Sequence, residues 1–195
     1  MTGMVGALIT SFFLDSGYIL YILPVMILTF SYMVPLLPGR KKLRDYHWVK
    51  LFAVASVIVY TVTIVPGLMN GVNPTTLFYH TIAGLVFVSL VALLFDIRDI
   101  VFDKIQGTKS LPVYFGITGI KRFAYFFSFA GLTIEGLLAN QFIQDLPELI
   151  AMMTTYIIIL FFYYKINDKP KKASYSLFAD GLLALPYLLH KLLTW

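Results

Sequence analysis

The chain of 195 residues has no cysteine and little charge, with Asp, Glu, Lys and Arg making up only 13% of it. The absence of cysteine excludes disulfide scaffolds, thiolate metal sites and cysteine nucleophiles. A soluble domain carries roughly 25% charged residues, because most of its surface faces water. The deficit, combined with 59% hydrophobic residues, excludes a soluble globular enzyme and a disordered chain. It indicates a single membrane domain over residues 1–195.

The apolar residues gather in runs that are long enough to cross a bilayer. A membrane-spanning helix needs about 20 predominantly apolar residues. A shorter apolar piece at 2–14 precedes the full-length runs, as the end of a helix, as an interfacial piece or as a frayed terminus. We therefore expect an all-α, multi-pass transmembrane helical bundle with six full spans and a partial N-terminal helix. The predicted spans are 18–37, 48–68, 76–95, 119–139, 146–164 and 174–193.

The basic residues lie on alternate connections between these runs. Fourteen of the fifteen Lys and Arg residues fall within 38–50, 96–122 and 165–173, and only Lys191 lies elsewhere. Short cytoplasmic loops of membrane proteins are enriched in Lys and Arg. The net charge of +5 therefore predicts a cytoplasmic face rather than nucleic-acid binding. We expect an integral protein of the bacterial plasma (inner) membrane, with the lipid bilayer as a partner and no nucleic acid.

Three of the ten acidic residues lie together at the predicted cytoplasmic end of the run 76–95. Asp96, Asp99 and Asp103 have the spacing i, i+3, i+7, which on a regular helix keeps them within about 60° of one another. Like charges so placed repel, and a divalent cation such as Mg²⁺ reverses that effect. The neighbouring bases suit an anion at the same place. The alternative is an ordinary solvated helix end.

The stretch from Phe95 to Gly116 resembles a known motif. Its sequence, FDIRDIVFDKIQGTKSLPVYFG, is similar to the second aspartate-rich motif of the UbiA-type intramembrane prenyltransferases. That motif reads D-x-x-D-x-x-x-D, then Gly, a basic residue, Ser/Thr-Leu and a closing small-apolar-Gly. Tyr32-Met33-Val34-Pro35 resembles the family's Tyr-x-x-Pro segment, and Asp180-Gly181 resembles a feature of its final helix. The resemblance covers residues 18–193.

The resemblance implies a Mg²⁺-dependent transfer of a prenyl group from a prenyl diphosphate to an aromatic or lipid-like acceptor in the membrane. Asp99 and Asp103 match the core pair of the motif and would be the catalytic Mg²⁺ ligands, with Asp96 as a further ligand. The candidates for diphosphate binding are Lys109, Arg98, Lys104, Arg40 and Tyr32. Charges of this kind stabilise a leaving diphosphate.

The chain departs from the family at its N-terminus. The first aspartate-rich motif, N-D-x-x-D-x-x-x-D, has no match, and Met1 aligns within the third helix of the family. We therefore expect that the first two to three helices are absent from this sequence. The explanations are a start codon assigned too late, a split or truncated gene, or a natural short paralogue. A missing segment or a separate chain would then supply the first motif.

Two further acidic residues lie within predicted spans, and ionisable groups at membrane depth usually face the bundle interior. Glu135 and Asp180 are candidates for acceptor binding or proton removal, or each forms a hydrogen bond to a neighbouring helix. The three histidines form no pair suited to a metal. Two other functions stay open: a non-catalytic remnant or partner subunit, and a small cation transporter that uses the three aspartates and Glu135.

Overall fold

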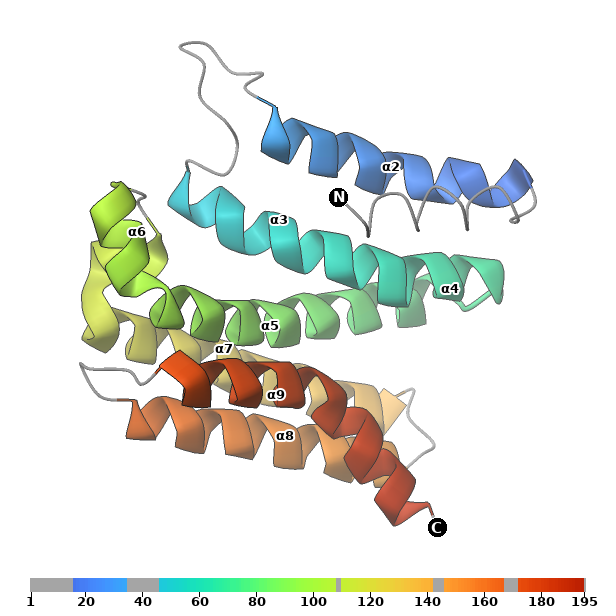
Figure 1. Ribbon diagram of the computed structural model, residues 1–195. Coiled ribbons are helices and arrows are strands. Elements are labelled where there is room, and N and C mark those ends of the chain that lie inside the picture. Colours follow the sequence, from blue (N-terminus) through green and yellow to red (C-terminus); the bar gives the residue numbers. More distant parts are fainter. Residues whose placement is uncertain (1–15, 35–45, 108–109, 142–145, 167–171, 195) are drawn as a thin grey trace.

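The computed structural model describes residues 16–34, 46–107, 110–141, 146–166 and 172–194. All secondary structure in these ranges is helical, and the long helices lie side by side as a bundle (Figure 1). This confirms the all-α prediction, whereas the piece at 2–14 lies outside the described residues. The elements are α2 (Ser16–Met33), α3 (His47–Val59), η2 (Tyr60–Ile64), α4 (Val65–Met69), α5 (Pro74–Arg98), α6 (Ile100–Gln106), α7 (Leu111–Gln141), α8 (Leu146–Lys165) and α9 (Lys172–Leu193).

Three helical stretches of the described chain are long and apolar enough to cross a membrane, namely Val49–Met69, Pro74–Arg98 and Leu146–Lys165. They coincide with three of the six predicted spans. The other three predicted runs fall largely on α2, α7 and α9, which are helical. In α2 the apolar stretch is shorter, from Leu23 to Tyr32. The number of spans beyond three remains a prediction.

The first of these stretches is one continuous helix with a widened turn in its middle. The five residues of η2 form a π-helical turn, in which the Val65 N–H donates to the Tyr60 carbonyl. Pro66 explains the wide turn, because proline has no N–H and its ring clashes with the carbonyl four residues earlier. The turn shifts Val62 and Thr63 onto the wall of a cavity described below.

The start of α5 follows from its sequence. The Asn73 side chain caps the helix by accepting a hydrogen bond from the Thr75 N–H at 2.9 Å. Pro74 occupies the first helical position, where a missing N–H costs nothing. At the other end, α6 stops at Gly107, whose φ of 70° lies in the left-handed region that favours glycine.

Helix α5 is the centre of the bundle. Half of its apolar stretch is buried, against 28% for each of the other two spanning stretches. It packs against α3, α7 and α9, and Leu90, Leu94 and Ile97 on it are inaccessible or nearly so. Residues at its two ends are therefore the best placed to be held rigidly by several helices.

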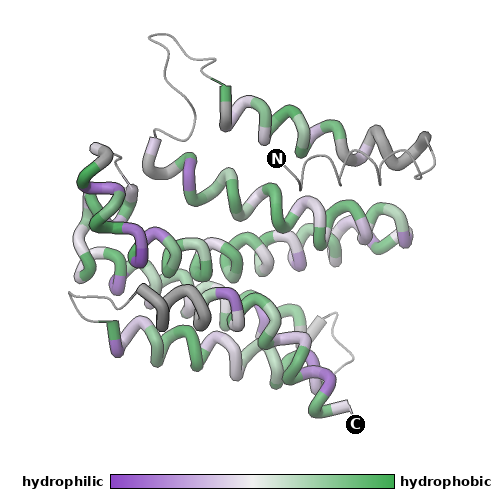
Figure 2. Tube along the Cα trace, viewed as in Figure 1, coloured by the Kyte–Doolittle hydropathy of each residue, from purple (hydrophilic) through white to green (hydrophobic). Residues whose placement is uncertain are grey.

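Large apolar side chains are also exposed on several helices, and Figure 2 shows apolar residues spread along the coloured parts of the helices. Phe126 and Phe129 on α7 are 70% and 72% exposed, and Phe161 on α8 is 62% exposed. Helices that are apolar all round belong in a protein interior or in lipid. The outward apolar side chains are those expected of a protein in a bilayer.

Five helix termini that flank the basic segments lie at the same end of the bundle, together with α6 (Figure 1). These are the starts of α3, α7 and α9 and the ends of α5 and α8. Lys50, Arg98, Lys104, Lys121 and Lys165 lie there, and Lys121 donates to the Tyr164 carbonyl at 3.2 Å. We call this the basic end, and the other the opposite end.

Candidate functional site

The aspartate cluster at the basic end is interrupted by a break in the helix. Asp99 has φ −93° and ψ 4°, and separates α5 from α6. The backbone ladder nevertheless continues, since the Asp99 N–H donates to the Phe95 carbonyl at 3.1 Å and the Asp103 N–H donates to the Asp99 carbonyl at 2.8 Å. Asp96 stays close enough to Asp99 and Asp103 for their negative charges to act on it. Because of the break at Asp99, the three side chains do not point in the directions that a regular helix would give them.

Lys50 joins two of the three carboxylates. Its Nζ lies 2.7 Å from Asp96 Oδ1 and 3.4 Å from Asp103 Oδ2. Asp96 and Asp103 are only 6% and 5% exposed. Lys50 comes from the first turn of α3, so this contact links α3 to α5 and α6 across the bundle. One ammonium between two buried carboxylates leaves the group with a net charge of −1.

Asp99 has a different partner. Arg98 Nε lies 2.8 Å from Asp99 Oδ1 and Arg98 Nη2 lies 2.9 Å from Asp99 Oδ2, a two-pronged ion pair. The Asp99 side chain is 39% exposed, and the Arg98 guanidinium also lies over the Phe95 ring at 5.1 Å. The expectation that all three carboxylates share one helical face is therefore met only by Asp96 and Asp103. The break at Asp99 is the reason.

The residues below this site are buried. Tyr163 of α8 is fully buried, and its hydroxyl donates to the Leu90 carbonyl of α5 at 2.7 Å. Ile97, one residue from Asp96, is fully buried. Within the described residues, the buried Asp96 Oδ2 has no hydrogen-bond partner. A buried carboxylate oxygen without a donor is costly, and a cation or a ligand donor would satisfy it.

The other predicted binding residues are distributed as follows. Lys104 is exposed on α6, and Tyr32 is half-buried on α2 near the end that reaches the basic end (Figure 1). Asp180 is exposed on α9, and its charge attracts the Arg98 guanidinium. Lys109 and Arg40 lie outside the described residues. The structure thus places Asp180 within electrostatic reach of Arg98, at the same end of the bundle.

A Mg²⁺ site depends on how many carboxylates converge. In the described part of the chain, no three Asp, Glu or His side chains converge as a ready-made metal site. Mg²⁺, however, usually binds only one or two protein carboxylates and keeps several waters for substrate phosphates. Asp96 and Asp103 meet that requirement, and the unpartnered Asp96 Oδ2 is a suitable oxygen. The residues present fit Mg²⁺ through this pair, with Asp99 tied to Arg98.

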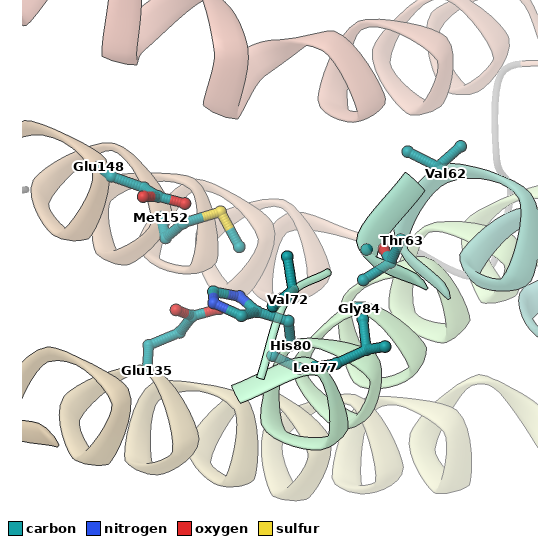
Figure 3. Close-up of a pocket in the computed structure, with 11 residues that line it drawn as sticks. Val62, Thr63, Val72, Leu77, His80, Gly84, Glu135, Glu148 and Met152 are labelled. Carbon is teal, nitrogen blue, oxygen red and sulfur yellow. The ribbon is translucent and has the colours of Figure 1, made fainter. Parts of the chain in front are cut away.

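A second polar region lies at the opposite end. A cavity of about 370 Å³, partly open to the outside, lies between the η2–α4 segment, the start of α5, the end of α7 and the start of α8 (Figure 3). Its polar lining residues are Thr63, His80, Glu135 and Glu148. Glu135 is 3% exposed. Its apolar lining includes Val62, Leu77 and Met152.

This cavity is remote from the aspartate cluster. His80 and Asp96 are sixteen residues apart on α5, which corresponds to about 24 Å along the helix axis. The structure therefore does not bring Glu135 to the aspartates, whereas it does bring Asp180 there. The two candidate acceptor residues belong to different regions.

Sequence reasoning missed the most important partner in the site. Lys50 was counted only as the last residue of the basic segment 38–50, although it lies in the first turn of an apolar run. A charged residue at such a position usually pairs inside the bundle, and this was the available signal. Nothing in the sequence indicated that His80, Glu135 and Glu148 share a cavity, because they come from three helices.

No family model, curated protein or solved structure matches the chain. The functional interpretation is therefore drawn from the residues themselves. At the basic end these are two buried carboxylates that share a lysine, a half-buried Arg–Asp pair beside them, and a buried oxygen with no donor among the described residues. Such a group can bind a cation, an anion carried by that cation, or both.

Proposed function

We propose that the chain is a UbiA-like membrane protein that binds a prenyl diphosphate with Mg²⁺ at its basic end and transfers the prenyl group to a membrane-soluble acceptor. The observation that carries the proposal is the pair of buried carboxylates, Asp96 and Asp103, that share Lys50 at the end of the central helix. The aspartate spacing of the motif supports it. So does the apolar surface around the site.

The proposed topology has six spans, with α2, α7 and α9 added to the three apolar stretches. The basic end faces the cytoplasm, in keeping with the enrichment of cytoplasmic loops in Lys and Arg. Arg98, Lys104 and Lys50 then lie where a water-soluble diphosphate head arrives from the cytoplasm. The prenyl chain of the same molecule stays in the bilayer.

The distances suggest different tasks for the two carboxylates. Lys50 holds Asp96 at 2.7 Å and Asp103 more loosely at 3.4 Å, so Asp103 is the easier one to release to a new partner. Lys50 itself has three N–H donors, one of which can turn to a phosphate oxygen. Asp96 and Asp103 would hold Mg²⁺, which when bound offsets negative charge on the leaving diphosphate.

Helix α6 offers an apolar surface for the prenyl chain beside these charges. Asp103 is buried on one side of this helix, whereas Val101, Phe102 and Ile105 are exposed by 55%, 53% and 80%. Apolar side chains so exposed at an aqueous boundary are unfavourable unless lipid or a lipid-like ligand covers them. The arrangement suits a substrate with a charged head and an apolar tail.

The test is binding of farnesyl diphosphate to the purified protein in maltoside micelles, measured by calorimetry with and without Mg²⁺. We expect Asp103→Asn and chelation of Mg²⁺ each to weaken binding at least about tenfold, because each removes at least one charge-assisted contact to the diphosphate. Glu148→Gln removes one carboxylate at the opposite end and serves as the matched control. Unchanged affinity in both Asp96→Asn and Asp103→Asn would overturn the proposal.

A second candidate function is favoured by the ion pairs themselves. Lys50 and Arg98 already satisfy much of the charge on Asp96, Asp99 and Asp103, so the cluster can serve to hold α3, α5 and α6 together. The chain would then be a non-catalytic partner subunit. Farnesyl diphosphate binding without prenyl transfer to any quinone precursor, even beside a chain that carries the first aspartate-rich motif, would favour this candidate.

A further inference from the structure

The cavity at the opposite end differs from the basic end in its charges. Its lining includes the carboxylates of Glu135 and Glu148 and the imidazole of His80, and none of the described residues that line it is a lysine or arginine. The remaining lining residues are apolar or small, apart from Thr63. A volume of about 370 Å³ lies within the range of pockets that bind small molecules.

Glu135 is the most constrained of these groups. Only 3% of Glu135 is exposed. Figure 3 shows its carboxylate in the cavity, turned toward the His80 ring. Among the described residues, Glu135 has no hydrogen bond and no ion pair. Burying a carboxylate without a partner is costly, and a buried acid usually pairs with a cation. The Glu135 carboxylate faces the cavity, so a ligand held there can reach it.

The other wall of the cavity supplies a second carboxylate. Glu148 and Met152 are four residues apart on α8, so they lie on one face of that helix, and both line the cavity across from Glu135 (Figure 3). Val62 and Leu77 add apolar surface, with Val62 placed there by the wide turn of η2. The cavity therefore combines two negative groups with an apolar wall.

This combination selects the chemistry of the ligand. A metal ion is disfavoured, because no three acidic or histidine side chains converge to hold one in the described part of the chain. An anion is disfavoured by the two carboxylates. A primary ammonium can donate up to three hydrogen bonds to the Glu135 and Glu148 carboxylates, while a short alkyl group contacts Val62, Leu77 and Met152.

We propose that this cavity binds an organic primary ammonium with a short apolar part, and that Glu135 is its main charge partner. The cavity is independent of the prenyl diphosphate site, about 24 Å away along α5. The ammonium could belong to a free alkylamine or to the ethanolamine head of a phospholipid. Both present the same group to Glu135.

The test uses n-butylammonium as the probe and n-butanol as the uncharged probe of similar size. Binding to the protein in lipid-free maltoside micelles is measured by calorimetry. We expect saturable binding of butylammonium that falls at least about tenfold in Glu135→Gln and about threefold in Glu148→Gln. Asp180→Asn removes one carboxylate at the basic end and leaves this binding unchanged. Butanol gives no saturable binding.

Glu135→Asp is the second variant, because it keeps the charge and shortens the reach. Intermediate binding in Glu135→Asp supports the proposal. No saturable binding by the wild type, or equal affinity in Glu135→Gln, overturns it. Farnesyl diphosphate binding in the same preparations reports on the basic end separately, so loss of one site is distinguished from loss of the other.

A short-chain phosphatidylethanolamine, added as a competitor, distinguishes the two sources of the ammonium. Displacement of butylammonium by this lipid, but not by the matching phosphatidylglycerol, supports the lipid head as the ligand. Failure of both lipids to displace butylammonium, with Glu135-dependent binding intact, supports a free amine. Equal displacement by both lipids overturns charge recognition at Glu135.

Discussion

Buried acidic side chains have different surroundings at the two ends of the bundle. At the basic end Asp96 and Asp103 share the ammonium of Lys50 at 2.7 and 3.4 Å. At the opposite end Glu135 is buried at least as deeply, yet it faces a cavity to which the described part of the chain contributes no lysine or arginine. Burial alone therefore does not define the role of an acidic side chain in this bundle. Its role depends on which charged or polar groups the fold places beside it.

Two buried tyrosines of α8 repeat this contrast. Tyr163 donates its hydroxyl to the Leu90 carbonyl at 2.7 Å, toward the basic end. Tyr156 is equally inaccessible and packs edge-on against Phe87, but its hydroxyl has no hydrogen-bond partner within the described residues. Of these two hydroxyls, the one nearer the basic end is therefore satisfied, and the other has no partner among the described residues.

The largest effect is expected for Lys50→Met. It leaves Asp96 and Asp103 buried without a counter-charge, and breaking a buried ion pair from one side costs about 3–5 kcal/mol. The free energy of unfolding in detergent, measured by denaturant titration, checks this. Lys50→Arg keeps the charge and should lose much less. Millimolar Mg²⁺ should restore part of the stability of Lys50→Met if the carboxylate pair binds it, and no restoration would count against the proposed metal site.

The second prediction compares one acid from each end. Asp96→Asn weakens the short contact with Lys50, and we expect a loss of about 2 kcal/mol. Glu135→Gln removes a charge that has no partner, so stability should stay the same or rise. Both changes keep nearly the same side-chain volume. Equal destabilisation of the two variants in the same denaturant assay would show that the two ends do not differ.

The third prediction concerns packing beside Glu135. Gly131 lies on α7 against Tyr156, and an added Cβ would lie 2.5–2.6 Å from ring and hydroxyl atoms of that tyrosine. Gly131→Ala therefore forces a buried ring to move, at a cost of about 1.5 kcal/mol. Gly136, on the same helix, has no heavy atom within 4 Å of the built Cβ.

Gly136→Ala is consequently the matched control. It should be neutral or stabilise the protein by up to about 1 kcal/mol through helix propensity. The thermal unfolding midpoints of the two variants provide the measurement. A midpoint for Gly131→Ala at or above that of Gly136→Ala would mean that Tyr156 has room to move.

The smallest effect is expected for the tyrosine pair. Tyr163→Phe removes the hydrogen bond to the Leu90 carbonyl and should cost about 1 kcal/mol. Tyr156→Phe removes a buried hydroxyl that bonds to nothing described, so we expect no loss or a small gain. The difference between the two variants is the quantity to measure. A loss in Tyr156→Phe as large as in Tyr163→Phe would indicate that the Tyr156 hydroxyl has a partner.

The sequence predicted the spanning helices well where the apolar runs are uniform. The run predicted at 76–95 corresponds to Pro74–Arg98, and the run at 146–164 corresponds to Leu146–Lys165. The physical reason is local: a helix satisfies its own backbone groups, and an apolar run of this length has no better state in lipid. The prediction placed the start of the first of these two helices at residue 76, two residues after Pro74.

The site was only partly predictable. The spacing of Asp96, Asp99 and Asp103 indicated a shared function, but the regular helix assumed for it ends at Arg98. After this break Asp99 forms an ion pair with Arg98, whereas Asp96 and Asp103 both pair with Lys50. Helical periodicity cannot foresee a break whose geometry depends on what packs around it.

The sequence by itself determined that this chain is helical, that its apolar runs suit a bilayer, and that its basic residues alternate between connections. These properties depend on residues that are near in sequence, through hydrogen bonds and side-chain hydration within one segment. Only the tertiary structure decided that Lys50 belongs to the aspartates and that Glu135, His80 and Glu148 share one cavity. Such pairings join residues from different helices, and their energies depend on distance and burial, which exist only once the helices have packed.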